Sequence, residues 1–111
     1  LVPGRLADSR LTAKLRGGRS TAWQVIGSAG APAGTAALVL NVTVTDPSSD
    51  GFLTVYPCGT TPPWVSNLNF DAGQTLSNHV TAEPGEAGTI CIYSSVDTHV
   101  VIDVEGTFGH T

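Results

Sequence analysis

The sequence predicts an all-β fold, a single antiparallel β-sandwich of two sheets with seven or eight short strands. Apolar and polar side chains alternate over several short stretches, with the two-residue period of a strand that has one buried face. Val and Thr are frequent, and 13 glycines and 7 prolines interrupt the chain at short intervals. No apolar stripe of helical period is sustained. The pattern fits jelly-roll and immunoglobulin-like connections equally and does not separate them.

The clearest alternation lies between residues 36 and 57, in the stretch AALVLNVTVTDPSSDGFLTVYP. It predicts two strands, 36–45 and 52–57, that pair as a hairpin. The connection between them is rich in Asp, Ser, Pro and Gly. Such residues favour a turn because their side chains bond to nearby backbone and because glycine accepts positive φ.

Four apolar side chains set the register of this predicted hairpin. Val44 is expected opposite Leu53, and Val42 is then opposite Val55. All four share one face, which we expect to be buried. A slip of one residue would move them all to the polar face, so the apolar set fixes the pairing.

The remaining strands follow the same rule. We expect them at 21–26, 66–70, 76–82, 89–93 and 98–108. The last two are predicted to form a second hairpin. In the final strand, one face would hold Val100, Ile102, Val104 and Phe108.

The chain length fits one domain over residues 1–111, and charge divides it unevenly. Residues 1–20 are predicted to be a basic N-terminal arm or an edge strand. This segment contains all five basic residues of the chain, which are Arg5, Arg10, Lys14, Arg16 and Arg19. Its one acid is Asp8, and the other eight acids follow later in the sequence.

A basic arm has two interpretations. It is typical of nucleic-acid binding, or it lies across the acidic body of its own domain. We favour the second because the formal net charge of −4 opposes the attraction of phosphate groups. We therefore expect no nucleic-acid partner. Asp8 and Asp103 are the expected counter-charges of Arg5 and Arg10.

Cys58 and Cys91 stand at the end of one predicted strand and within another. Neither belongs to a CxxC pair, and no histidine is placed to complete a zinc cluster. A disulfide between them would stabilise the fold by roughly 3–4 kcal/mol on the loop-entropy model and would imply an oxidising compartment. The alternative is a pair of buried free thiols.

Six blocks of sequence carry a family resemblance. They are RLADSR at 5–10, ALVLNVTVTDP at 37–47, GFLTVYPCG at 51–59, SNLNF at 66–70, AGQTLSN at 72–78 and HVVIDVEGTF at 99–108. Together they resemble an accessory β-sandwich repeat module of secreted and cell-surface actinobacterial proteins, often in tandem or appended to hydrolases. The resemblance covers nearly the whole chain. It implies a non-catalytic domain that attaches to carbohydrate or cell-wall polysaccharide.

The chain departs from the family at a few positions. The family pattern RLLDTR has bulkier residues where this chain has Ala7 and Ser9. Cys58 and Cys91 look like an addition of this member. These differences leave the implied fold unchanged.

Catalysis is not expected. His99 and Asp103 share a face of the last predicted strand, but nothing places a nucleophile on a strained turn or beside an oxyanion donor. We therefore predict that the protein is not an enzyme and needs no cofactor. No metal site is predicted. Whether a calcium ion binds the turn between Asp46 and Asp50 stays open, since paired aspartates are also ordinary turn formers.

The predicted ligand-binding residues are Trp64, Asn67, Asn69 and Tyr56. Sugars present apolar faces and hydroxyl groups, so their sites combine a flat aromatic ring with amide partners. Trp64 follows Pro62 and Pro63 on what should be a stiff loop. The alternatives are that Trp64 caps the edge of the core and that Tyr56 lies beneath a neighbouring loop.

Two functions from different classes therefore stay open. The first is a secreted or cell-surface module that binds carbohydrate or cell-wall polysaccharide. The second is a structural spacer or protein-interaction domain that contacts neighbouring domains of a parent secreted protein through a sheet face or edge. No stretch approaches the roughly 20 apolar residues that cross a bilayer, so membrane insertion is not expected.

Overall fold

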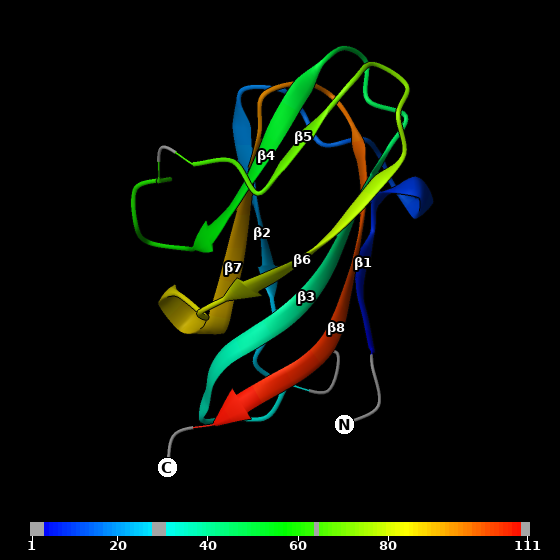
Figure 1. Ribbon diagram of the computed structural model, residues 1–111. Helices are drawn as coiled ribbons and strands as arrows, with labels where there is room; N and C mark the ends of the chain where they lie inside the picture. Colours follow the sequence, from blue (N-terminus) through cyan, green and yellow to red (C-terminus); the bar gives the residue numbers. More distant parts are fainter. Residues whose placement is uncertain (1–3, 28–30, 64, 110–111) are drawn as a thin grey trace.

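The computed structural model describes residues 4–27, 31–63 and 65–109 and consists of two four-stranded antiparallel sheets (Figure 1). This confirms the predicted β-sandwich. The first sheet holds, in spatial order, β1 (Gly4–Asp8), β8 (His99–Gly109), β3 (Thr35–Thr45) and β6 (Leu76–Ala82). The second sheet holds β2 (Arg19–Gln24), β7 (Thr89–Ser94), β4 (Gly51–Pro57) and β5 (Leu68–Phe70). In the described residues, two short 3₁₀ helices, η1 (Ser9–Leu11) and η2 (Glu86–Gly88), lie in the connections.

The strand order is that of a jelly roll. Successive strands change sheet at every connection except the one between β4 and β5. The orders β1-β8-β3-β6 and β2-β7-β4-β5 bring the first and last strands of the described chain side by side. Eight strands arranged in two sheets of this kind form a double Greek key. The structure thereby selects the jelly roll from the two topologies that the sequence allowed.

The pairing predicted for both hairpins is wrong. β3 pairs with β6 and β8, whereas β4 pairs with β5 and β7, so the turn at 46–50 carries the chain from one sheet to the other. β7 and β8 are likewise in different sheets. The alternating pattern is satisfied equally well by two strands that face each other across a core and by two that lie side by side.

The burial of the predicted apolar face is confirmed. Val42, Val44 and Leu53 are fully buried and Val55 nearly so, and all four belong to one core between the sheets. β8 contributes Val100, Ile102 and Val104 to the same core. β7 contributes Ile90 and Ile92 from the opposite sheet.

One residue of the predicted inner face of β8 points the other way. Phe108 is 58% exposed, whereas Val104 is fully buried. The pairing with β3 slips between these two positions, because Leu40 is opposite Val104 while Val39 is opposite Gly106. This bulge inserts one residue and reverses the alternation that follows it.

β1 lies at the edge of the first sheet, as expected of an edge strand within residues 1–20. Its pairing with β8 covers Gly4 to Asp8. None of the helical segments in the described ranges has the length and apolar character needed to cross a membrane.

Candidate functional site

A long connection between β4 and β5 crosses the outer face of the second sheet. The described part of this connection, residues 58–63 and 65–67, is here called the groove loop. At its start Cys58 forms a disulfide with Cys91 of β7, with the two Cα atoms 5.1 Å apart. The predicted bridge is therefore present. It ties the groove loop to a strand adjacent to β4.

The far end of the groove loop is held by hydrogen bonds. Thr54, which is buried in β4, donates from Oγ1 to the carbonyl of Val65 at 2.8 Å. The Asn67 side chain accepts the backbone N–H of Val55 at 2.6 Å, and the Asn67 N–H donates to the Leu53 carbonyl at 2.8 Å. Because both ends of the loop are fixed, the space beneath it has a defined shape.

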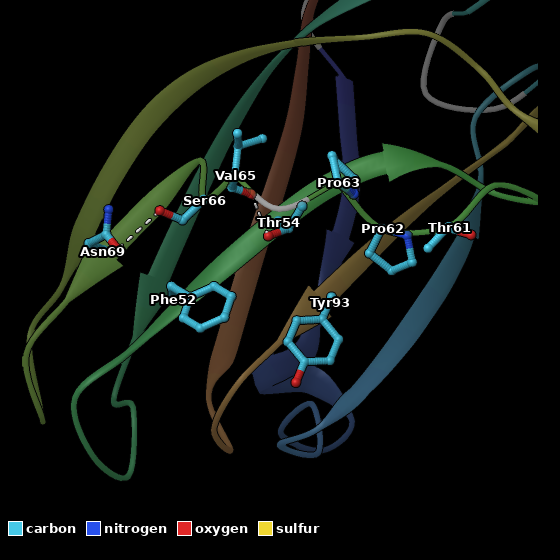
Figure 2. A pocket seen from close by; sticks show the side chains of 9 residues that line it. All are labelled: Phe52, Thr54, Thr61, Pro62, Pro63, Val65, Ser66, Asn69 and Tyr93. Atoms are coloured by element: carbon cyan, nitrogen blue, oxygen red, sulfur yellow. Dashed lines mark hydrogen bonds between the residues drawn. The ribbon is translucent and has the colours of Figure 1, made fainter.

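That space is a pocket of about 510 Å³, here called the aromatic groove. Its walls come from the groove loop and from the outer faces of β4, β5 and β7 (Figure 2). The lining residues are Phe52, Thr54, Thr61, Pro62, Pro63, Val65, Ser66, Asn69 and Tyr93. The size lies within the range typical of small-molecule sites.

Two aromatic rings form the floor of the aromatic groove. Phe52 and Tyr93 lie on neighbouring strands with ring centroids 5.9 Å apart and planes tilted by 38°. Phe52 is 38% exposed, so its ring meets solvent. Figure 2 shows both rings on the same side of the sheet, with Pro62 beside Tyr93. This geometry gives a flat-sided ligand an apolar surface.

Polar groups stand at both ends of the aromatic groove, with Ser66 and Asn69 at one end and Thr61 at the other (Figure 2). Ser66 donates from its hydroxyl to Asn69 Oδ1 at 3.1 Å, which leaves the amide NH₂ of Asn69 directed to other partners. Asn69 is exposed, as is Thr61 on the groove loop. These groups can donate to and accept from hydroxyls of a bound ligand.

The four residues predicted to bind a ligand lie in different environments. Asn69 lines the aromatic groove. Asn67 uses its carboxamide oxygen to hold β4, as described above, and acts as a positioning residue. Tyr56 is only 6% exposed, and its hydroxyl donates to Ser20 Oγ of β2. Its side chain is therefore buried, and it does not line the aromatic groove. Trp64 lies outside the described residues.

Tyr93 is the main residue of the aromatic groove that sequence reasoning missed. A signal for it existed in the segment TICIY. Ile90 and Ile92 point into the core, so Cys91 and Tyr93 share the outer face. A bridge from Cys58 to Cys91 also places the start of the groove loop over that face.

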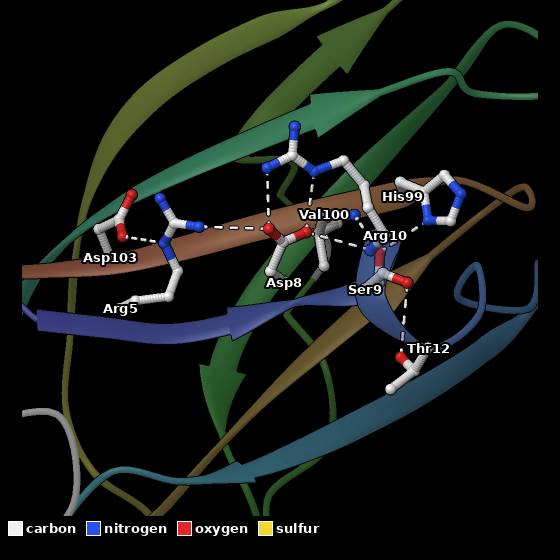
Figure 3. A network of polar contacts seen from close by, with 8 residues as sticks. All are labelled: Arg5, Asp8, Ser9, Arg10, Thr12, His99, Val100 and Asp103. Carbon is white, nitrogen blue, oxygen red and sulfur yellow. Dashed lines mark hydrogen bonds and ion pairs between the residues drawn. The ribbon is translucent and has the colours of Figure 1, made fainter.

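A second polar region surrounds β1, and it confirms the expected arginine–aspartate pairing (Figure 3). Arg5 Nε lies 2.5 Å from Asp103 Oδ1, and Arg10 Nη2 lies 2.8 Å from Asp8 Oδ2. Arg5 also pairs with Asp8 at 3.2 Å. The side-chain hydrogen bonds from Arg10 are the main reason that the pKa of Asp8 falls to about 2.

Ser9 and His99 form a close pair beside this network. Ser9 Oγ lies 3.0 Å from His99 Nδ1 and accepts the N–H of Val100 at 2.7 Å. Ser9 is 6% exposed. A nucleophilic serine needs an open approach and oxyanion donors, and here the hydroxyl is enclosed and bonded to the backbone of β8. The pair therefore fastens η1 to β8.

The aspartates of the 46–50 turn are engaged by protein groups. Asp46 Oδ2 lies 3.1 Å from Lys14 Nζ, and Asp50 Oδ1 accepts the N–H of Ala72 at 2.8 Å. Within the described residues no group of three or more His, Cys, Asp and Glu side chains is arranged to hold a metal ion.

Comparisons of the chain with protein-family models, with curated proteins and with solved structures gave no match.

Proposed function

We propose that the chain is a non-catalytic accessory module that binds carbohydrate, in particular cell-wall polysaccharide, in the aromatic groove. The observation that carries this proposal is the tilted pair of Phe52 and Tyr93, open to solvent beneath an anchored loop. Sugar rings have apolar C–H faces that pack on aromatic rings, and their equatorial hydroxyls bond to amides and hydroxyls at the rim. Asn69 and Thr61 supply such groups.

The anchoring of the groove loop supports a binding role. The Cys58–Cys91 bridge and the Thr54–Val65 hydrogen bond hold the loop above the sheet. A ligand then meets a surface that is already shaped, and less conformational entropy is lost on binding.

The setting proposed for this module follows from the disulfide and from the resemblance of the six sequence blocks. A structural disulfide is typical of proteins outside the reducing cytosol. We place the module in a secreted or cell-surface protein of actinobacterial type, beside a hydrolase or other neighbouring domains. In this role it uses no cofactor, binds no nucleic acid and is not inserted in a membrane.

The test is a binding assay on insoluble cell-wall polysaccharides, with soluble oligosaccharides as competitors. Phe52→Ala and Tyr93→Ala should each weaken retention about tenfold, because each removes one face of the stacking surface. Phe108→Ala is the matched control, since Phe108 is an exposed aromatic outside the aromatic groove and should bind as the wild type does. Trp64→Ala tests the residue predicted from sequence.

Equal retention of the wild type, Phe52→Ala and Tyr93→Ala would remove the aromatic groove from the binding role. Loss of retention in Phe108→Ala as well would indicate nonspecific adsorption through exposed aromatic side chains instead. Each variant is checked by urea unfolding, so that loss of fold is not taken for loss of binding.

A spacer or protein-interaction role is the second candidate, and the composition of the groove wall favours it. Pro62, Pro63 and Val65 make that wall apolar, and Val65 is 61% exposed. Apolar exposed surface of this kind also suits a neighbouring domain. In that case the isolated module would show no polysaccharide affinity. Its groove residues would be protected from hydrogen exchange or labelling when it is joined to its neighbour.

A further inference from the structure

A second cleft lies at the open side of the sandwich, between the two edge strands β1 and β2. It has a volume of about 560 Å³ and is closed at one end by the segment that connects these strands. We call it the basic cleft. It shares no lining residue with the aromatic groove, so the two sites can be tested separately.

The floor of the basic cleft is apolar. Leu6, Leu15 and Trp23 line it, and all three pack against the sandwich core. Trp23 is half-buried, so part of its ring faces the cleft. An indole surface of this kind favours the flat face of a ring-shaped ligand.

The rim of the basic cleft is cationic. Lys14, Arg16 and Arg19 line it, and the one acidic lining residue among those described is Asp8. The Asp8 carboxylate already accepts hydrogen bonds from Arg10, and it forms an ion pair with Arg5. Its negative charge is therefore neutralised by residues outside the cleft.

The charges of Arg16 and Arg19 are available to a ligand. Both side chains are exposed, and neither takes part in an ion pair with any residue in the described part of the chain. Lys14, in contrast, is held by Asp46 at 3.1 Å. Two uncompensated guanidinium groups beside an apolar floor suit a ligand that carries its own negative charge.

The backbone that carries these arginines is held by hydrogen bonds to the connection between β7 and β8. Leu15 and Thr98 exchange both of their backbone hydrogen bonds, at 2.8 and 3.2 Å. The N–H of Gly17 donates to Asp97 Oδ1 at 2.7 Å, and the N–H of Gly18 donates to the Ser94 carbonyl at 2.8 Å. Arg16 and Arg19 are next to these hydrogen-bonded residues in the sequence, so little backbone ordering is needed when a ligand binds.

We propose that the basic cleft binds an acidic saccharide unit. Its carboxylate pairs with Arg16 and Arg19, and the sugar ring packs on Trp23. The exposed hydroxyl of Thr12, which also lines the cleft, accepts a hydrogen bond from a sugar hydroxyl.

Charge distribution favours this ligand over a nucleic acid. A nucleic acid presents a phosphate at every nucleotide and needs a wide basic surface. Here the basic residues are confined to one segment of a chain with net charge −4, and eight of its nine acids lie outside that segment. A single carboxylate on a sugar fits the local positive charge without approaching the acidic surface.

The test uses a galacturonic acid oligosaccharide and the corresponding neutral galactose oligosaccharide, titrated into the full chain by calorimetry or NMR. The acidic oligosaccharide should bind more tightly, and its affinity should fall as salt is raised. Arg16→Gln and Arg19→Gln should each weaken it about tenfold, the loss expected for one charge-assisted contact. Thr81→Glu is the control, since it lowers the net charge by the same one unit at an exposed residue of β6 outside the cleft.

Four results would overturn the proposal. One is the absence of binding by the wild type at millimolar acidic oligosaccharide, and another is equal binding of the acidic and neutral forms. The third is an equal effect of Thr81→Glu and Arg16→Gln, which would show a diffuse charge effect. Tighter binding of single-stranded DNA than of the acidic oligosaccharide, with the same dependence on Arg16 and Arg19, would assign the cleft to nucleic acid instead. Phe52→Ala should leave this binding unchanged whatever its effect in the aromatic groove.

Discussion

Cys58 and Cys91, with Cα atoms 5.1 Å apart, join the first residue of the groove loop to the strand that carries Tyr93. The covalent bond that stabilises the sandwich therefore also sets the position of the aromatic groove. Stability and the shape of the candidate site depend on the same pair of residues.

Removal of this bond should lower the free energy of unfolding. For Cys58→Ala combined with Cys91→Ala, we expect a loss of about 3–4 kcal/mol on the loop-entropy model. The two residues are 33 apart in sequence, so the unfolded chain regains the freedom of that loop. Urea unfolding of the wild type with and without reductant, beside the double variant, measures the effect.

The double variant also serves as the control, because reductant should leave its unfolding midpoint unchanged. A wild-type protein whose midpoint does not move when the bond is reduced would contradict this prediction.

Strand positions could be predicted from the sequence because alternation acts within a single strand. The strand expected at 76–82 coincides with β6, and the one expected at 89–93 lies within β7. Sheet membership could not be predicted in the same way. Val42 is buried opposite Ile102 of β8, and Val55 is buried opposite Ile92 of β7. Both positions are buried, and a pattern of buried residues does not indicate which strand is the neighbour.

The candidate site was predictable only in part, for a related reason. Asn69 could be placed on an exposed face because Leu68 and Phe70 on either side of it are apolar. Asn67 has the same parity as Asn69, yet its amide bonds to the Val55 backbone. That contact depends on how β5 pairs with β4, which the sequence pattern did not specify. Tyr93 and Phe52 come together for the same reason, as residues of paired strands.

Acid should weaken the fold through Asp8. A carboxyl whose pKa is lower in the folded state than in the unfolded chain stabilises the fold at pH values above the unfolded pKa, about 3.9. The pKa of Asp8 is lowered to about 2, chiefly by hydrogen bonds from Arg10. Its contribution should therefore begin to fall below about pH 4 and be lost as the pH approaches 2.

Asp8→Asn separates this contribution from the rest of the protein. The variant should be less stable than the wild type near neutral pH, and the difference should shrink as the pH falls through this window. Arg10→Gln should shrink it as well, since Arg10 is the main cause of the shift. Urea midpoints measured from about pH 2 to 6 give the two curves. Parallel curves for the wild type and Asp8→Asn would show that Asp8 has no such role.

An added methyl group at Gly17 should damage the fold. A Cβ there would lie 2.8 Å from Val96 Cα and 2.9 Å from the Val96 carbonyl carbon, so backbone atoms must move. We expect Gly17→Ala to lower the free energy of unfolding by about 1–3 kcal/mol, the usual cost of overpacking. Gly106→Ala is the matched control: a Cβ on Gly106 meets no atom within 4 Å. Its stability should stay within about 0.5 kcal/mol of the wild type, as for most surface substitutions.

Because Gly17 also donates its N–H to Asp97, the shift should displace Arg16 and weaken acidic-saccharide binding in the basic cleft. Equal unfolding midpoints for Gly17→Ala and Gly106→Ala would mean that the segment is not fixed against residues 96–97, and the preformed rim of the basic cleft would lose its structural basis.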